Sequence, residues 1–120
     1  MKIAVPVNED QHTICVSFGR TPEFLIIDSE NHSKEYIYNE AMTASGGAGI
    51  QAAQLIVDKG VEVLLTPRCG ENAAKVLKAA GIKMYQTTTE HSDTELQKYK
   101  EGKLEILNKI HAGFHNHGFE

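Results

Sequence analysis

A cysteine between a predicted strand and a predicted helix is the residue of this sequence best suited to chemistry. Residues 61–66 form an apolar run typical of a buried strand, and an amphipathic helix is expected to begin near Gly70. Cys69 lies between these elements, directly after Arg68. Because a helix N-terminus favours negative charge, we expect a lowered pKa for the Cys69 thiol, and Arg68 should lower it further. Ligands of open α/β sheets also bind at such turns, at the carboxyl ends of parallel strands.

The thiol of Cys69 is a soft ligand of the kind found in iron–sulfur, copper and zinc sites. One thiolate cannot hold a cluster alone, because structural cluster sites normally have several. We therefore expect weak, transient or mainly electrostatic binding of a metal–sulfur cluster, which suits a carrier. The alternative is that Cys69 is a small buried apolar residue, as free cysteines often are. Cys15 is expected to be a buried structural cysteine.

A glycine-rich segment precedes the other helix that is expected to face the same site. Such a segment lets backbone N–H groups approach an anion at a helix N-terminus. It is not a phosphate-binding loop, because Ile50 and Gln51 stand where Lys and Ser or Thr would follow. The glycines either permit close packing of helix on sheet or bind a negatively charged cluster. The candidate binding residues in this segment are Ser45, Gly46, Gly47 and Gly49.

A turn at residues 19–22 adds a cation to these candidates. Gly and Pro together interrupt regular structure there. The guanidinium of Arg20 either contacts an anionic ligand or caps a nearby carbonyl, whereas Phe18 is expected in the core. Met42 adds a thioether or is an apolar loop residue. The predicted cluster site therefore combines Arg20, the glycine-rich segment and Cys69.

Three of the six histidines lie within seven residues near the end of the sequence, at His111, His115 and His117. Neutral imidazoles at this density bind zinc, nickel or copper. Their spacing is not that of a zinc finger and there is no partner cysteine pair, so weak metal binding is expected rather than a fixed structural site. The alternative is a solvated end. The candidate metal ligands are thus Cys69 and these three histidines.

Composition limits the classes of function that fit. With 120 residues, the chain is long enough for one domain with its own core. A formal charge of −4 without a basic run argues against nucleic acid as a partner. No apolar run approaches the roughly 18 residues of a membrane span, and the strand-like residues from Lys2 onward leave no room for a signal peptide. We therefore expect a cytoplasmic protein that contacts neither nucleic acid nor membrane.

Motifs of common enzyme classes are missing from the sequence. It has no Gly-x-Ser-x-Gly elbow, no Walker loop and no His-Glu-x-x-His motif. Nucleases need several carboxylates around divalent metals, whereas only Asp28 and Glu62 are associated with predicted strands. The sequence therefore predicts a protein that is not an enzyme.

The elements that must position these residues follow from periodicity. Strands are expected at 2–7, 24–28, 34–39, 61–66 and 82–86, and helices at 45–59, 70–81, 92–100 and 103–110. The buried face of the first helix should contain Ile50, Ala53 and Val57. Ser92 and Glu95 should form a capping box at the third helix. Antiparallel strands followed by strand–helix–strand units predict an α/β fold with a mixed sheet.

Six segments, in order and with similar spacing, carry a resemblance to a known family. They are Lys2-Ile-Ala-Val-Pro-Val7, Ser17-Phe-Gly-Arg-Thr-Pro-Glu-Phe-Leu-Ile-Ile-Asp28, Gly46-Gly-Ala-Gly-Ile-Gln-Ala-Ala-Gln-Leu55, Asp58-Lys-Gly-Val-Glu-Val63, Cys69-Gly-Glu-Asn-Ala73 and Leu77-Lys-Ala-Ala-Gly-Ile-Lys83. Over residues 1–102 the sequence resembles the dinitrogenase iron–molybdenum cofactor biosynthesis family, which includes NifX-like nitrogenase accessory proteins. Many relatives have a histidine where this chain has Ser17, so an imidazole ligand expected there is missing.

The resemblance implies a single α/β domain with a ribonuclease-H-like motif, in which helices flank a central five-stranded mixed sheet of strand order 3-2-1-4-5. It implies a family domain at 1–102 and a C-terminal extension at 103–120. It also implies a non-catalytic carrier that binds an iron–molybdenum or related metal–sulfur cluster and meets a donor or recipient protein. Two other functions stay open: a regulatory module that binds a protein partner without a cofactor, and a mononuclear metal binder that uses the histidines.

Overall fold

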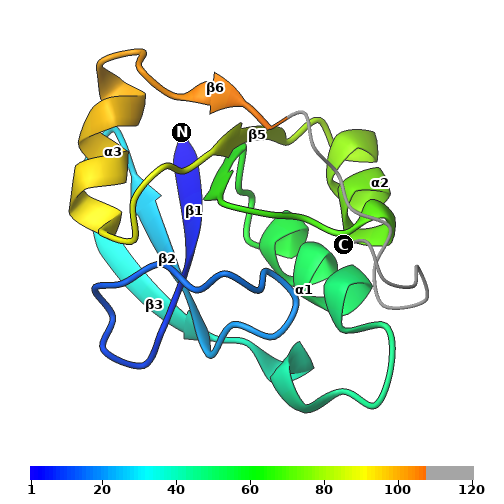
Figure 1. The fold of residues 1–120 in the computed structure, drawn as a ribbon. Helices are drawn as coiled ribbons and strands as arrows, with labels where there is room; N and C mark the ends of the chain where they lie inside the picture. Colours follow the sequence, from blue (N-terminus) through cyan, green and yellow to red (C-terminus); the bar gives the residue numbers. More distant parts are fainter. Residues whose placement is uncertain (108–120) are drawn as a thin grey trace.

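A six-stranded mixed sheet forms the centre of the protein in a computed structural model, which describes residues 1–107 (Figure 1). The strands are β1 (Lys2–Val7), β2 (Glu23–Asp28), β3 (Lys34–Tyr38), β4 (Val63–Thr66), β5 (Lys83–Gln86) and β6 (Glu105–Ile106). Their order in the sheet is β3-β2-β1-β4-β5-β6. β4 runs parallel to both β1 and β5, and the other pairs are antiparallel.

Helices cover both faces of this sheet (Figure 1). They are the 3-10 helix η1 (Glu40–Thr43) and the α-helices α1 (Ala48–Asp58), α2 (Glu71–Ala79) and α3 (Ser92–Lys100). Ala4 and Leu64 belong to the hydrophobic cluster under α1 and α2, whereas Val5 and Leu65 belong to the cluster that contains Leu96 of α3. Neighbouring residues of a strand thus face opposite layers. Among residues 1–107, no helix is long and apolar enough to cross a membrane.

The predicted α/β class and the order of the first five strands are confirmed, but the predicted number of strands is wrong. The sixth strand, β6, lies where a helix was expected over residues 103–110. Gly102 adopts a left-handed φ of 73° after α3, and the N–H of Leu107 then donates to the carbonyl of Met84. Pairing with the open edge of β5 satisfies backbone groups that a short terminal helix would leave to water. The ribonuclease-H-like motif stays a prediction.

The buried face of α1 differs from the predicted one. Ile50 is 44% exposed, and the buried residues of the helix are Ala48, Ala52, Ala53 and Ile56. Ala53 was predicted correctly, while Val57 is only half-buried. The face consists mainly of alanines because α1 packs closely against α2 as well as the sheet. Periodicity gives the spacing of a face but not which of two overlapping faces a second helix covers.

The carboxylate of Glu95 holds the loop between β5 and α3. The predicted capping box is wrong, because His91 is the N-cap and Glu95 accepts hydrogen bonds from Thr88 and Thr89 instead. Its oxygens lie 2.7 Å from the N–H of Thr88 and 2.8 Å from the hydroxyl of Thr89. Burial alone would raise the pKa of this fully buried carboxyl, but those hydrogen bonds and the charge of Lys98 outweigh it and lower the pKa.

Replacement of Glu95 is therefore expected to destabilise the fold and remove part of its pH dependence. Glu95→Ala should lower the free energy of unfolding by about 3 kcal/mol, because the N–H groups of Thr88 and Thr89 lose a charged acceptor. In the wild type this contribution is full above the ordinary pKa of 4.5 and is lost as pH falls through the lower folded pKa. Urea unfolding of the wild type and the variant between pH 3 and 7 measures both the loss of stability and its pH dependence. The exposed Glu101→Gln is the control, and equal effects of the two substitutions would contradict this role of Glu95.

Candidate functional site

The loops that follow three strands of the sheet meet at one edge, together with the N-terminal ends of two helices. β4 is parallel to β1, and β3 runs in the same direction because both β3 and β1 are antiparallel to β2, so the segments after β1, β3 and β4 leave the sheet on the same side. The segment after β4 leads directly into α2, and η1 leads into α1. We call this edge, formed by residues 17–20, 42–49 and 67–73, the glycine edge.

The first turn of α1 presents an open backbone at the glycine edge. Its N-cap, Gly47, has a left-handed φ of 71°, and no described side chain caps the helix. Ser45, Gly46 and Gly47 are exposed, and a Cβ added to Gly46 would meet nothing within 4 Å. The first turn contains no acidic residue. The uncapped N–H groups and the helix dipole therefore favour an anion here.

Two close backbone contacts bring the three parts of the edge together. A Cβ on Gly19 would lie 2.9 Å from the backbone nitrogen of Gly49, and a Cβ on Gly49 would lie 3.3 Å from the Cβ of Ala73. The turn after β1, the start of α1 and the start of α2 are thus in direct contact. The packing explanation for the glycines applies to Gly49, whereas Gly46 has neither a crowded environment nor a left-handed φ.

The guanidinium of Arg20 fixes the segment that leads into α1. Its Nη1 donates to the carbonyl oxygens of Met42 at 3.1 Å and Ala44 at 2.9 Å. The backbone N–H of Arg20 donates to the hydroxyl of Ser17 at 3.2 Å. Ser17 is the residue that stands where many relatives have a histidine. Of the two predicted roles, carbonyl capping is therefore confirmed. Nε and Nη2 make no hydrogen bond within residues 1–107, so they can contact an anion as well.

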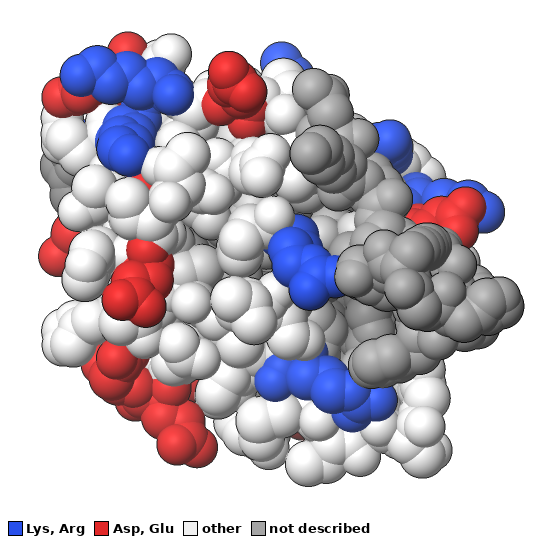
Figure 2. All heavy atoms as spheres, in the orientation of Figure 1, with Lys and Arg blue, Asp and Glu red and all other residues white. Residues whose placement is uncertain are grey.

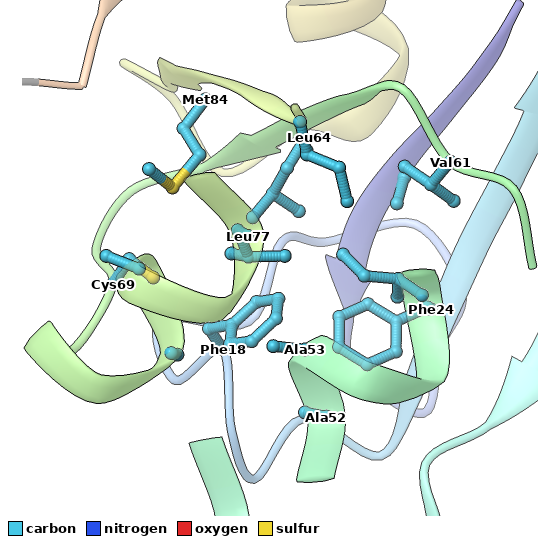
Figure 3. Packing of buried hydrophobic residues seen from close by; sticks show 14 of the residues in the cluster. Phe18, Phe24, Ala52, Ala53, Val61, Leu64, Cys69, Leu77 and Met84 are labelled. Atoms are coloured by element: carbon cyan, nitrogen blue, oxygen red, sulfur yellow. The ribbon is translucent and has the colours of Figure 1, made fainter. Parts of the chain in front are cut away.

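The thiol of Cys69 is buried, and the prediction of a lowered pKa is wrong. Only 1% of Cys69 is exposed, and Figure 3 shows its sulfur turned towards the packed side chains beside Phe18 and Leu77. Burial raises the pKa of Cys69 to about 12, and the charge of Lys78 offsets little of this effect. The sulfur donates to the carbonyl of Gly70 at 3.6 Å. A neutral thiol in the core is a poor metal ligand unless it moves and loses its proton.

The charges at the start of α2 differ from those at α1. Arg68 is exposed, which allows it to attract an anion, but the first turn of α2 contains Glu71. On the face shown in Figure 2, basic side chains lie near the centre over the region of α1, while the acidic side chains at the lower left lie over the loop after β1. The electrostatic arrangement therefore favours the α1 end of the glycine edge for an anion.

The remaining predicted ligands do not complete a metal site in the described part of the chain. Residues 1–107 contain no group of three or more His, Cys, Asp or Glu side chains that could hold a metal ion. Cys15 is half-buried rather than fully buried, and Met42 is half-buried in its loop. The predicted histidine ligands, His111, His115 and His117, lie outside the described residues.

Sequence reasoning missed two residues that shape the edge, Gly19 and Asn39. Asn39 is fully buried, caps η1 and also donates to the carbonyl of Gly19. Asn before a helical turn is a recognised capping signal, so the capping of η1 by Asn39 could have been predicted from the sequence. The bonds to a turn 20 residues earlier depend on tertiary structure.

Comparisons with known proteins give consistent matches. A sequence model described as "Dinitrogenase iron-molybdenum cofactor" matches residues 1–102. An uncharacterized protein of Methanocaldococcus jannaschii is 36% identical over 108 residues, covering 88% of this chain and 90% of that protein. The apo form of the orange protein of Desulfovibrio gigas is similar with a TM-score of 0.83 and 32% identity, covering 89% of this chain and 92% of the other. The NMR structure of a putative NifB protein from Thermotoga is similar with a TM-score of 0.79 and 30% identity, covering 94% of this chain and 98% of the other.

The two cysteines are expected to differ strongly in reactivity. With a pKa near 12 rather than the ordinary 9.0, Cys69 has an ionised fraction roughly a thousandfold smaller than an ordinary thiol at pH 8. Iodoacetamide should therefore modify only the half-buried Cys15 in the folded protein, and both cysteines in urea. Peptide mass spectrometry against time measures the two rates. Cys15→Ala is the control and should remove the fast phase, and rapid modification of Cys69 in the folded state would refute its burial.

Proposed function

The chain belongs to the dinitrogenase iron–molybdenum cofactor family, and we propose that it is a non-catalytic accessory protein that binds a metal–sulfur cluster and passes it on. The cluster is cargo, an iron–molybdenum or related metal–sulfur anion. The observation that carries this proposal is the open backbone of Gly46 at the uncapped start of α1, beside Arg20. Together these groups offer N–H donors and a positive charge at one exposed place.

Electrostatic attraction makes the main contribution to the free energy of the proposed cluster binding. Metal–sulfur clusters are anionic, and N–H groups at a helix N-terminus together with a guanidinium stabilise negative charge. Arg68 adds an exposed cation at the same edge. The neutral thiol of Cys69 contributes a bond to metal only if α2 shifts and the proton leaves. Such a site binds its cargo reversibly, as a carrier requires.

The glycine at position 46 supports this proposal because the fold does not require it. Its φ is not left-handed and its surroundings are open, so an alanine fits without strain. Glycine outside such positions allows a close approach of the backbone to something outside the chain. Gly47 and Gly49, by contrast, are favoured within the fold by a left-handed φ and by the tight contact with Ala73.

A protein-partner-binding module is the second candidate, favoured by apolar side chains exposed around the same edge. Val16 is 67% exposed and Ile50 is 44% exposed. Both lie within three residues of the Gly19–Gly49 contact. Exposed apolar side chains near one another are suited to contact with a protein partner. For this second candidate, the protein binds a partner protein and no cluster.

The first prediction of the carrier proposal concerns cluster binding and uses tetrathiomolybdate as the probe. Under anaerobic conditions the protein should retain a coloured, stoichiometric complex through gel filtration, measured by metal analysis and visible absorption. Arg68→Gln should weaken binding several-fold, and the effect should shrink at high salt because the charge is exposed. Lys34→Gln, a cation on β3, is the control and should leave affinity unchanged. A wild-type protein that stays colourless and retains no molybdenum would contradict the carrier function.

Substitution of glycines should separate binding from folding. Gly46→Ala should leave stability unchanged or raise it by up to about 1 kcal/mol, because it reduces the freedom of the unfolded chain. It should nevertheless lower affinity for tetrathiomolybdate, since the added methyl group stands between backbone and anion. Gly19→Ala is the matched contrast and should destabilise the protein, because its Cβ would clash with Gly49. If Gly46→Ala binds tetrathiomolybdate with the affinity of the wild type, the backbone of residue 46 is not part of the binding site.

A further inference from the structure

A buried asparagine joins the two loops that form the glycine edge. Asn39 follows β3 and is fully buried. Its Nδ2 donates to the carbonyl oxygens of Gly19 at 3.0 Å and Thr21 at 2.9 Å, and its Oδ1 accepts the N–H of Ala41 at 3.1 Å. Two donors and an acceptor on one short planar group are the property of an asparagine side chain. Asn39 therefore satisfies three backbone groups that come from both loops.

Arg20 makes the return connection between the same loops. Asn39 reaches the residues on either side of Arg20, while Arg20 reaches the carbonyl oxygens of Met42 and Ala44, which follow Asn39 in the chain. Each side chain thus holds the loop that carries the other. Since the backbone on both sides of Arg20 is fixed by Asn39, the position of the guanidinium depends on the asparagine.

This pair of loops is anchored to the sheet and to α1. The hydroxyl of Thr21 donates to the carbonyl of Val7 at 2.8 Å, at the end of β1. The backbone of Gly19, whose carbonyl Asn39 holds, packs directly on the first turn of α1 at Gly49. A displacement of residues 19–21 would therefore move the guanidinium and open the contact with the start of α1.

We propose that Asn39 is a positioning residue of the glycine edge, which acts through Gly19 and Arg20 and does not touch the cargo. Its side chain fixes the guanidinium relative to the N–H groups at the start of α1, so that both point to one anion. The ligand in this inference rests on the proposed function, whereas the arrangement of the loops does not.

Asn39→Asp is the sharpest test because it preserves shape. The variant keeps the acceptor for Ala41 but replaces two donors by an oxygen that faces the carbonyls of Gly19 and Thr21. Affinity for tetrathiomolybdate should fall about tenfold or more, as losses of outer-shell partners typically do. The amide signals of residues 19–21 and 47–49 should shift in NMR spectra, while that of Ala41 should change least. If this variant does not fold, Asn39→Ser, which keeps one donor, replaces it.

Ile37→Val, on the strand that precedes Asn39, is the matched control. Ile37 is buried under the helices, so loss of one methyl group destabilises the core without touching the loops. Affinity should stay within about twofold of the wild type in conditions where circular dichroism shows all variants folded. Equal loss of affinity in Asn39→Asp and Ile37→Val would reduce Asn39 to a general contributor to stability and overturn the proposal.

Two results distinguish failure of this inference from failure of the proposed function. Wild-type affinity and unchanged loop amides in Asn39→Asp would overturn the positioning role while the carrier function stands. A wild-type protein that binds no tetrathiomolybdate would remove the carrier function, and the amide signals would then decide alone whether Asn39 fixes the loops. Shifted signals confined to residues 39–41 would also overturn the role.

Discussion

The contact between the backbones of Gly19 and Gly49 is the constraint on which the rest of the glycine edge depends. A Cβ at Gly19 would lie 2.9 Å from the nitrogen of Gly49, so the turn after β1 reaches α1 only because no side chain intervenes. This approach brings Arg20 beside the segment before α1 and turns the first N–H groups of that helix towards the same place. The N-terminus of α1 stays uncapped by described side chains while its packing stays close.

The burial of Cys69 shows why position in the chain does not determine thiol chemistry. A cysteine before a helix N-terminus interacts with the dipole only if its sulfur lies near the N–H groups of the first turn, in contact with polar groups. Here the sulfur lies in the core under α2, where loss of hydration outweighs the positive end of the helix and raises the pKa to about 12. Desolvation of a charged group in an apolar core is a larger effect than an exposed dipole. The same burial gives Cys69 a packing role in the cluster that joins α2 to the sheet.

Local chemistry made most of the fold predictable, and long-range packing explains what was not. The strands β1 to β5 followed from apolar runs, and the ends of α1 and α2 followed from Gly60 and Gly81, both of which have left-handed φ. The order of these strands was expected only from the family resemblance. β6 was missed because two residues paired with an edge have no periodicity. The glycine-rich segment and Arg20 lie at one edge, and their role in binding stays a prediction. Asn39 was missed as a connector because its partners Gly19 and Thr21 are distant in sequence.

The carrier function that we propose needs reversible binding, and the way the glycine edge divides its contacts would provide it. A cluster held by several thiolates leaves only when metal–sulfur bonds break, whereas N–H groups and a guanidinium exchange with water and with another protein's ligands. The structure puts its one nearby thiol in the core and its N–H groups and Arg68 at the surface. The exposed Val16 and Ile50 lie beside those donors, where a recipient would exclude water as it binds. Under this proposal, transfer requires no change in the fold, because stronger ligands on the recipient are sufficient to displace a set of weak electrostatic contacts.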